Sequence, residues 1–415
     1  MIGIRYHSHS RTGILQARRG KAPAHRSRAP TNPVCPHYPN CFGCPLIALP
    51  YPEQLQRKRE RLVNSFANYS TLANAKISQI CASPRELGYR GRVKLVVRKT
   101  GAEVAAGLYL PGTHRVMDIS SCPVHPRAVN SVVHFLKRTI AEFRIAPYDE
   151  RNDTGQLRYL DLRYSFLNRE VSVTLVTRHA AFAEGKPLAR RIKQRFPFVS
   201  GVIQNINPGR GNVIWGAEYR ILIGRDSVVE KFGELDLEFP ANVFSQTNPF
   251  TAGKLYQKIV ELAALKGHEA VVDLYCGGGP IALYLARRAR LVWGIDDSPP
   301  SIVAAEHNAR RNRTVNCRFF AGDVAGKALE AKQQLSNIDL IVLNPPRKGI
   351  QPAALEAILA ARSPKIIYVS CDPKTLARDL DRFVWAGYAL RAVEPFDMFP
   401  QTEEVETMAL LTKRY

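Results

Sequence analysis

From about residue 250 onward, short apolar runs alternate with amphipathic stretches, and few folds are compatible with this pattern. Strand-like AVVDLYC, LVWGID and KIIYVSCD are separated by helix-like segments such as SIVAAEHNARRN. Strands that are apolar throughout are typical of parallel sheets that helices cover on both faces. The sequence therefore predicts an α/β fold for residues 240–415, a Rossmann-like domain with a doubly wound sheet.

The first half of the chain has a different sequence pattern. Residues 89–239 contain short alternating runs, such as RVKLVVRK and EVSVTLVTR, that Gly, Pro and Asn separate. This pattern predicts antiparallel strands. Before them, residues 50–70 show a helical pattern in which Leu55, Leu62 and Phe66 fall near one face and QRKRER forms the solvated side. We therefore expect a second, mostly β domain at residues 34–239.

The chain opens with a basic segment. Residues 1–33 carry seven Lys or Arg residues and no acidic residue. Too few side chains here are apolar to offset the entropy of ordering, so we expect a disordered basic tail. An Arg-rich start also fits an organelle transit peptide or a start codon placed too early, and the sequence leaves these alternatives open.

Positive charge is concentrated in the first half of the chain. The whole chain has 59 Lys and Arg against 36 Asp and Glu, a net charge of +23. Residues 1–239 carry +19 of this charge and residues 240–415 only +4. A solvated charged face explains charge but not an excess of one sign. We therefore expect a polyanionic partner, and nucleic acid before any other.

Several classes of protein are excluded. No stretch approaches 18 consecutive apolar residues, so we expect no membrane span. The N-terminus lacks the apolar run of a secretory signal, which indicates a cytoplasmic protein. In that compartment the eight cysteines are not expected to form disulfides, and they indicate metal binding, catalysis or burial. The sequence does not fix the oligomeric state, for which we expect a monomer.

A glycine-rich loop, DLYCGGGP, follows one predicted strand and opens a helix at residues 273–280. Glycines let a ligand approach the backbone, and the helix N-terminus faces that ligand. Asp296 ends the next strand, where a carboxylate typically binds ribose hydroxyls, and Asp323 ends the third. The fourth strand stops at an NPP motif, residues 344–346. This series resembles the layout of class I S-adenosylmethionine methyltransferases, with a doubly wound domain for another nucleotide cofactor as the alternative.

Two reactive side chains follow the last predicted strands. Cys371 lies in YVSCDP, just past the fifth strand. A thiolate there can add to an electrophilic carbon, although burial is the ordinary fate of a free cysteine. Glu406 opens the apolar run TMALL, which we expect to be an inner strand. A carboxylate that enters a sheet edge beside a nucleophile is a candidate proton acceptor.

Three further cysteines lie close together near the start. Cys35, Cys41 and Cys44 have the spacing C-x5-C-x2-C, and Cys122 follows far downstream. Four thiolates suit a tetrahedral zinc ion or an iron–sulfur cluster. Only one C-x2-C pair is present, and the C-x3-C-x2-C spacing of radical enzymes is absent. The spacing therefore favours neither metal, and four buried cysteines without a metal are a third alternative.

Several motifs stand in the same order as in the RNA uracil-C5 methyltransferases, the family that makes 5-methyluridine in 23S ribosomal RNA and transfer RNA. The chain resembles this family from about Cys35 to Tyr415. The shared motifs are the four cysteines, FSQTNP, DLYCG, NPPRKGI, YVSCDP and FDMFPQT. Only the basic segment precedes Cys35, which is similar to the shorter ribosomal RNA branch that lacks an N-terminal β-barrel module.

The resemblance implies a role for each matching residue. It implies that a [4Fe–4S] cluster is bound by four cysteines, Cys35, Cys41, Cys44 and Cys122. It implies that S-adenosylmethionine is bound by five residues, Gln246, Tyr275, Asp296, Asp323 and Asn344. Cys371 would be the nucleophile and Glu406 the base. The implied fold is a Rossmann-like class I methyltransferase domain preceded by a mostly β, iron–sulfur-bearing RNA-binding domain, with the 50–70 helix packed on either one.

The implied reaction is methylation of uridine C5 in structured RNA, and 23S ribosomal RNA is the expected substrate. Thiolate addition to C6 makes C5 nucleophilic, C5 takes the methyl group, a base removes the C5 proton, and the thiolate leaves. This chemistry needs no electrons, so we expect the cluster to be structural. The alternatives are the T-loop uridine of transfer RNA and a non-catalytic RNA-binding or ribosome-assembly factor, against which Cys371 and Glu406 argue.

The sequence also departs from the family pattern. Glu404 stands where relatives commonly have His, Gly91 where many have Asn, and Pro280 where a small or polar residue is commoner. A second carboxylate at position 404 would raise the pKa of the base. Unless they are only solvated surface residues, the candidates for RNA contact are Tyr89, Arg90, Arg92, Lys94, Arg98, Arg347 and Lys348.

Overall fold

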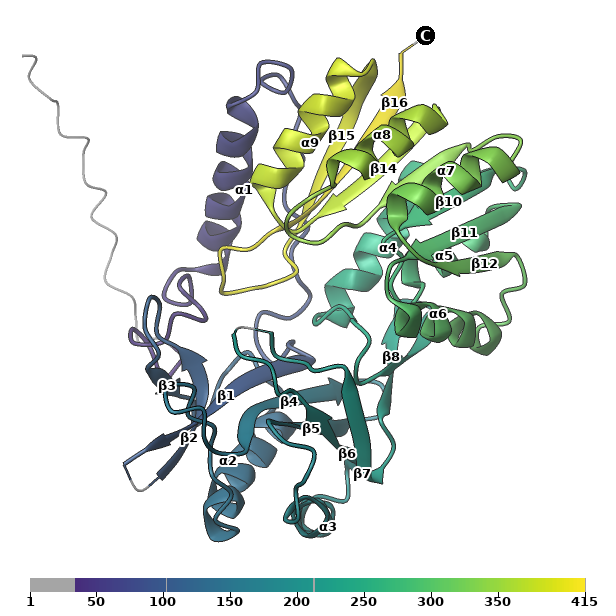
Figure 1. The fold of residues 1–415 in the computed structure, drawn as a ribbon. Helices are drawn as coiled ribbons and strands as arrows, with labels where there is room; N and C mark the ends of the chain where they lie inside the picture. Colours follow the sequence, from purple (N-terminus) through teal and green to yellow (C-terminus); the bar gives the residue numbers. More distant parts are fainter. Residues whose placement is uncertain (1–33, 102, 212, 415) are drawn as a thin grey trace, which may run out of the picture.

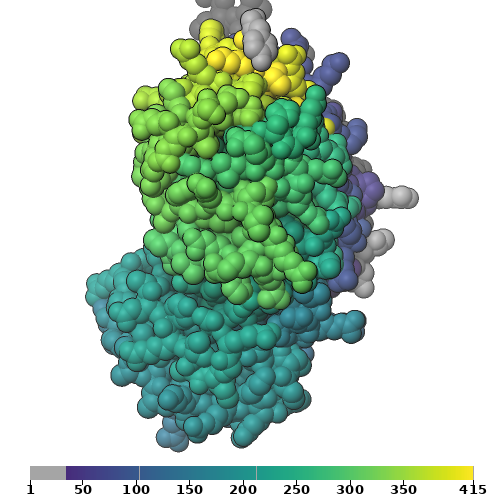
Figure 2. Space-filling model, turned by 90° about the vertical axis from the view of Figure 1, so that its right-hand side faces the viewer, coloured from purple at the N-terminus to yellow at the C-terminus, as the bar shows by residue number. Residues whose placement is uncertain are grey.

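A computed structural model describes residues 34–101, 103–211 and 213–414. The predicted basic tail, residues 1–33, lies outside the described residues. The described chain forms two lobes, each built around one large sheet (Figure 1). Figure 2 shows the lobes stacked, with the teal N-terminal lobe below the green and yellow C-terminal lobe.

The sheet of the N-terminal lobe has seven strands in the order β3-β2-β1-β4-β5-β6-β7. The strands are β1 (Arg92–Thr100), β2 (Glu103–Tyr109), β3 (Val116–Asp118), β4 (Leu157–Ser165), β5 (Glu170–Thr177), β6 (Val199–Ile206) and β7 (Glu218–Gly224). Neighbouring strands are antiparallel except β5 and β6. The expectation of antiparallel strands is wrong for that pair, because the chain between them forms the crossover helix that parallel pairing needs.

Two helices cover this sheet, so the lobe is less purely β than the sequence suggested. They are α2 (Arg127–Glu142) and α3 (Gly185–Arg195). Val132 and Leu136 of α2 and Ile192 of α3 share one buried core with Val93 and Leu160 of the sheet. The apolar side chains of α2 recur at helical spacing, which is the physical reason this stretch forms a helix rather than another strand.

The sheet of the C-terminal lobe also has seven strands, in the order β12-β11-β10-β13-β14-β16-β15. The strands are β10 (Ala270–Leu274), β11 (Leu291–Asp296), β12 (Cys317–Ala321), β13 (Leu340–Leu343), β14 (Lys365–Ser370), β15 (Tyr388–Phe396) and β16 (Glu406–Lys413). The helices are α4 (Pro249–Ala263), α5 (Pro280–Ala286), α6 (Pro299–Arg311), α7 (Val324–Gln334), α8 (Pro352–Ala361) and α9 (Pro373–Trp385). The predicted alternation of strands and helices is confirmed, and β10 to β14 are parallel.

Helices cover both faces of this sheet, as the apolar strands predict. Successive residues of a strand point to opposite faces. Val272 and Leu274 of β10 lie in a core with α7, α8 and α9, whereas Val271 lies in a second core with α4, α5 and α6. The fold is therefore a doubly wound, Rossmann-like α/β sheet.

One strand interrupts the parallel order. β16 lies between β14 and β15 and runs antiparallel to both, so the sheet is mixed. This position makes it the inner strand that the apolar run TMALL predicted. Its first residue, Glu406, comes directly after the loop of residues 397–405.

Two elements that precede residue 240 pack on the C-terminal lobe. Helix α1 (Tyr51–Ala67) places Leu62 and Phe66 in the core beside α9, and Figure 1 shows the two helices side by side. The hairpin of β8 (Ser227–Phe232) and β9 (Leu235–Pro240) joins the core on the opposite face of the sheet. Among the described residues, no helix is both long and apolar enough to cross a membrane.

Candidate active site and cysteine pocket

The glycine loop lies between β10 and α5, at the carboxyl edge of the parallel strands. Tyr275, Gly277 and Gly279 all have positive φ, at +62°, +54° and +85°. A Cβ on Gly277 would meet no atom within 4 Å, so the space around the loop is open to a ligand. Pro280, the departure from the family pattern, is the first residue of α5, where its fixed φ suits a helix and its missing N–H is not needed.

Three polar residues follow the ends of neighbouring strands. Asp296 ends β11, Asp323 follows β12, and Asn344 follows β13. The Asp296 carboxylate accepts hydrogen bonds from the backbone N–H groups of Gly277 (2.8 Å) and Ser298 (3.0 Å), and burial raises its pKa. Because β10 to β13 are parallel strands of one sheet, these side chains and the glycine loop lie at the same edge. The arrangement fits a ligand that carries both ribose hydroxyls and polar groups.

Gln246 lies in a different place from the other four residues that the resemblance assigned to S-adenosylmethionine. It is half-buried in the link between the lobes and lines a small cavity with Arg163 and Phe239. The Phe239 ring also lies against the glycine loop, because a Cβ on Gly278 would stand 2.8 Å from that ring. Phe239 thus contacts both the glycine loop and the cavity that Gln246 lines.

Cys371 and Glu406 lie at the edge where β14 ends and β16 begins. Ser370, the last residue of β14, pairs with Thr407, so Cys371 and Glu406 each lie one residue beyond this pair at the same end of the ladder. They are close enough for the charge of Glu406 to act on the Cys371 thiol. Burial raises the pKa of Glu406 to about 7. Burial and, after it, the charge of Glu406 raise the pKa of the Cys371 thiol to about 11.

Arg347 supplies positive charge to this pair. Its guanidinium lowers the pKa of both Cys371 and Glu406, against the larger effect of burial. Arg347 Nη2 lies 3.5 Å from a carboxylate oxygen of Glu404, and Arg61 Nη1 lies 3.9 Å from the other oxygen. Glu404, the residue that replaces His, is therefore held between two arginines, and its charge raises the pKa of Glu406 as expected.

Asp379 of α9 is a buried residue near the site that the sequence analysis missed. Its Oδ2 accepts hydrogen bonds from the N–H of Ile350 (2.9 Å) and the hydroxyl of Tyr368 (2.7 Å). It thereby fixes the end of the NPPRKGI loop to the helix that follows Cys371. The usable signal was its place between Leu376 and Leu380, since a carboxylate on an apolar helix face indicates a buried partner.

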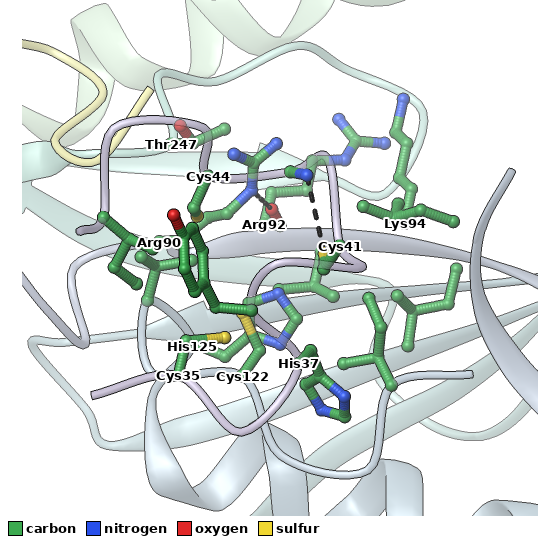
Figure 3. Close-up of a pocket in the computed structure, with 18 of the residues that line it drawn as sticks. Cys35, His37, Cys41, Cys44, Arg90, Arg92, Lys94, Cys122, His125 and Thr247 are labelled. Carbon is green, nitrogen blue, oxygen red and sulfur yellow. Dashed lines mark hydrogen bonds between the residues drawn. The ribbon is translucent and has the colours of Figure 1, made fainter. Parts of the chain in front are cut away.

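The four cysteines assigned to a cluster line one cavity of about 310 Å³ (Figure 3). Cys35 is buried, and Cys41, Cys44 and Cys122 are partly buried. Among the described residues, no three Cys, His, Asp or Glu side chains are grouped so that they could hold a metal ion. The structure thus brings the four thiols to one cavity without forming a metal site.

The expected RNA contacts differ in their surroundings. Tyr89 is fully buried and its hydroxyl donates to a backbone carbonyl at 2.9 Å, so the prediction of an RNA contact is wrong for this residue. Arg92 pairs with Asp161 at 2.7 Å, and Arg98 pairs with Glu150 at 3.4 Å. These two guanidinium groups are engaged within the lobe. The residues that remain candidates are Arg90, Lys94, Arg347 and Lys348.

The model of the tRNA (uracil-5-)-methyltransferase family matches residues 50–414. The chain belongs to this family. The resemblance that the motifs indicated is therefore confirmed, as is the prediction of a methyltransferase enzyme that acts on RNA.

Two similar proteins and one solved structure agree with this assignment. The chain is 41% identical to an uncharacterized RNA methyltransferase of Geobacter sulfurreducens, over 92% of this chain and 77% of the relative. It is 37% identical to one from Halalkalibacterium halodurans, over 92% and 82% of the two chains. It is 27% identical to the solved tRNA (uracil-54, C5)-methyltransferase of Pyrococcus abyssi in complex with S-adenosyl-L-homocysteine, with a TM-score of 0.72 over 90% and 86%.

Proposed function

We propose that this methyltransferase transfers a methyl group from S-adenosylmethionine to C5 of a uridine in structured RNA. The observation that carries the proposal is the proximity of Cys371 and Glu406, one residue beyond the Ser370–Thr407 pair, at the sheet edge that also bears the glycine loop and Asp296. A thiol nucleophile and a proton acceptor beside the methyl donor are what this reaction needs. A protein that only binds RNA needs neither group.

The reaction balances with these two side chains. S-adenosylmethionine, the second substrate, supplies an electrophilic methyl group. The Cys371 thiolate forms a bond to uracil C6, and the electron pair of the C5–C6 double bond moves toward the C4 oxygen. C5 then bonds to the methyl carbon as the bond from that carbon to the sulfonium sulfur breaks, and S-adenosylhomocysteine leaves. Glu406 takes the C5 proton, the C5–H electron pair restores the double bond, and Cys371 leaves as a thiolate.

The pKa values assign different work to the two groups. With a pKa of about 7, Glu406 exchanges protons readily near neutral pH, which suits a general base. With a pKa of about 11, the Cys371 thiol is protonated in the free enzyme and must ionise during the reaction. The positive charge of Arg347 favours the thiolate, so we propose that this arginine assists the addition step.

For the substrate, we propose 23S ribosomal RNA, one of the RNAs in which the family that the motifs resemble makes 5-methyluridine. One observation favours transfer RNA instead, since the solved relative with a TM-score of 0.72 acts on uridine 54 of transfer RNA. The excess of positive charge in residues 1–239 suits either polyanion. The target base must leave its stack to reach Cys371 in both cases.

Five residues would hold S-adenosylmethionine. Tyr275 and the glycine loop would lie under it, Asp296 would accept from the ribose hydroxyls, and Asp323 and Asn344 would complete the edge. The open space around Gly277 supports this assignment. Gln246 would reach the ligand from the link between the lobes, beside Phe239.

We also propose that the cysteine pocket holds a [4Fe–4S] cluster, ligated by Cys35, Cys41, Cys44 and Cys122. Such a cluster binds each thiolate to a different iron, so its ligands stand farther apart than those of a single ion. Four thiols around a cavity of about 310 Å³ support this choice over zinc. The cluster would hold the cysteine-rich segment against the N-terminal sheet.

The decisive experiment uses anaerobically purified protein and a Cys371→Ala variant. Each is incubated with S-adenosylmethionine and unmodified 23S ribosomal RNA or transfer RNA, and the digested nucleosides are identified by mass spectrometry. We expect 5-methyluridine with the wild type alone, and the better RNA identifies the substrate. Bound iron and acid-labile sulfide are measured on the same samples.

The opposite result is equally clear. If neither RNA gains a methyl group while both proteins bind RNA, the catalytic proposal fails for these substrates, and a binding or assembly role takes its place. If the protein contains zinc, or no metal, at full activity, the cluster proposal fails while the catalytic one stands.

A further inference from the structure

The loop of residues 397–405 connects Phe396 to its ladder partner Glu406, the proposed base. It joins β15 to β16, and Glu406 is the first residue after it. A loop of this length has no regular hydrogen-bonding pattern of its own, so its shape depends on external contacts. In Figure 1 this yellow loop passes beside the start of α1, which belongs to a distant part of the sequence.

A buried ion pair ties the loop to that helix. Lys58 Nζ lies 2.5 Å from Oδ1 of Asp397 and donates to the carbonyl oxygen of Phe399 at 2.9 Å. The Lys58 and Asp397 side chains are both 0% exposed. The Tyr51 hydroxyl donates to Oδ2 of Asp397 at 2.8 Å, so both oxygens of the carboxylate are engaged. Lys58 was assigned to the solvated side of its helix by sequence, and that assignment is wrong.

A second tie follows four residues farther along the loop. Gln54 Nε2 donates to Oε1 of Gln401 at 2.8 Å, and the backbone N–H of Gln401 donates to Oε1 of Gln54 at 3.0 Å. Gln54 and Lys58 are spaced one helical turn apart, so they present one polar face to the loop. The loop is thus attached to α1 at residues 397, 399 and 401.

Helix α1 is itself a firm support. Its Leu62 and Phe66 are 0% and 2% exposed and belong to the core that includes the β14 residue Tyr368. The same core therefore fixes the strand before Cys371 and the helix that holds the loop before Glu406. A buried charge pair such as Lys58 and Asp397 adds little to stability, but its geometry is specific. This property suits a pair that positions a loop better than one that only stabilises the fold.

We propose that Lys58 is a positioning residue that, through the loop of residues 397–405, sets the Glu406 carboxylate where it can take the C5 proton. The proposal rests on the uridine methylation proposed above. Lys58 touches neither substrate, and it acts only through the backbone of the loop. Its effect should therefore fall on proton removal, the step that needs Glu406, and not on thiolate addition or methyl transfer.

This order of steps gives a signature that general destabilisation does not produce. If Glu406 is displaced by about 1 Å, proton removal should slow by about 10²-fold. Cys371 would still add to C6 and C5 would still gain the methyl group, so RNA that carries the new methyl would stay covalently bound to Cys371. Loss of folded protein would instead reduce the adduct and the released product in proportion.

The test uses the holoenzyme with the double substitution Lys58→Met and Asp397→Asn. Both charges are removed together, so no unpaired charge remains buried. The matched control is Arg57→Met, which removes one charge from the exposed neighbour of Lys58. Methyl-labelled S-adenosylmethionine and unmodified RNA are mixed with each protein. Adduct is read on a denaturing gel, and released 5-methyluridine after digestion.

We expect the double variant to form labelled adduct at the wild-type rate and to release product about 10²-fold more slowly, as Glu406→Gln should. Arg57→Met should match the wild type. If the double variant does not fold, Gln54→Leu replaces it in the test, because this substitution removes only the hydrogen bonds between Gln54 and Gln401. It should show a smaller excess of adduct than the double variant would. Wild-type release by a folded variant, or a parallel loss of adduct and product, would overturn the proposal. Failure of the proposed function is distinct, because then the wild type itself transfers no label.

Discussion

Replacing Glu406 by Gln should stabilise the protein relative to the wild type as the pH rises. Glu406 is 3% exposed, and burial raises its pKa from the ordinary 4.5 to about 7. Below pH 4.5 the carboxyl is protonated in both the folded and unfolded states, and its contribution to stability is fully present. As the pH rises, the unfolded state ionises first, so stability falls until the pH passes about 7.

The size of this effect follows from the two pKa values. The gap between 4.5 and about 7 corresponds to about 3 kcal/mol, at about 1.36 kcal/mol per pH unit. Gln is uncharged at every pH, so the variant should gain about 2 to 3 kcal/mol on the wild type between pH 5 and pH 8. The side chain of Arg347 is 67% exposed, and solvent screens its opposing effect.

The assay is urea unfolding of both proteins over a series of pH values. Taking the difference between them cancels the titration of the other groups. Glu356→Gln is the matched control, because the same substitution there changes an exposed side chain on α8 and leaves the surroundings of Glu406 intact. A difference that stays constant with pH, or a wild type that gains on the variant at high pH, would refute the argument from burial.

Two other predictions concern the rate and the core. The kcat for release of methylated RNA should rise with pH through about 7 and continue to rise toward about 11, because Glu406 and Cys371 must both be ionised. The rate of methyl transfer in a single turnover should not show the rise near pH 7, because methyl transfer precedes proton removal. A rise near pH 7 in that rate would contradict the order of steps. Phe66→Ala should cost about 3–5 kcal/mol, measured as a lower urea midpoint, because the side chain fills the core between α1 and the sheet. A loss below about 1 kcal/mol would show that α1 is not a firm support.

Much of the C-terminal lobe could be predicted because the sequence patterns that specify its elements are local. The apolar strands, the glycine loop and the acids at strand ends each lie within a few residues of the element they define. Asp296 and Cys371 were placed at the carboxyl edge from strand ends alone, since that edge is shared by all parallel strands. The roles of these residues stay a prediction until activity is measured.

What the sequence could not show depends on partners far along the chain. Lys58 is charged and lies among other charged residues, so only Asp397, 339 residues away, accounts for its burial. Tyr89 looked like part of an RNA-binding segment, but its hydroxyl is bound by the carbonyl of Pro400, 311 residues away. The insertion of β16 between β14 and β15 is likewise a pairing choice that alternation alone does not specify.

The place of β16 also bears on how the protein is made. The ribosome synthesises Cys371 before Glu406, so a nascent chain contains the proposed nucleophile before it contains the proposed base that frees the RNA. However, β16 also joins β15 to the rest of its sheet, as the strand between β14 and β15. Translation that stops before residue 406 therefore removes the strand that links β15 to β14, together with the proposed base. We expect such an aborted chain to be unable to complete its sheet, so that it does not become a folded trap that captures RNA and cannot release it.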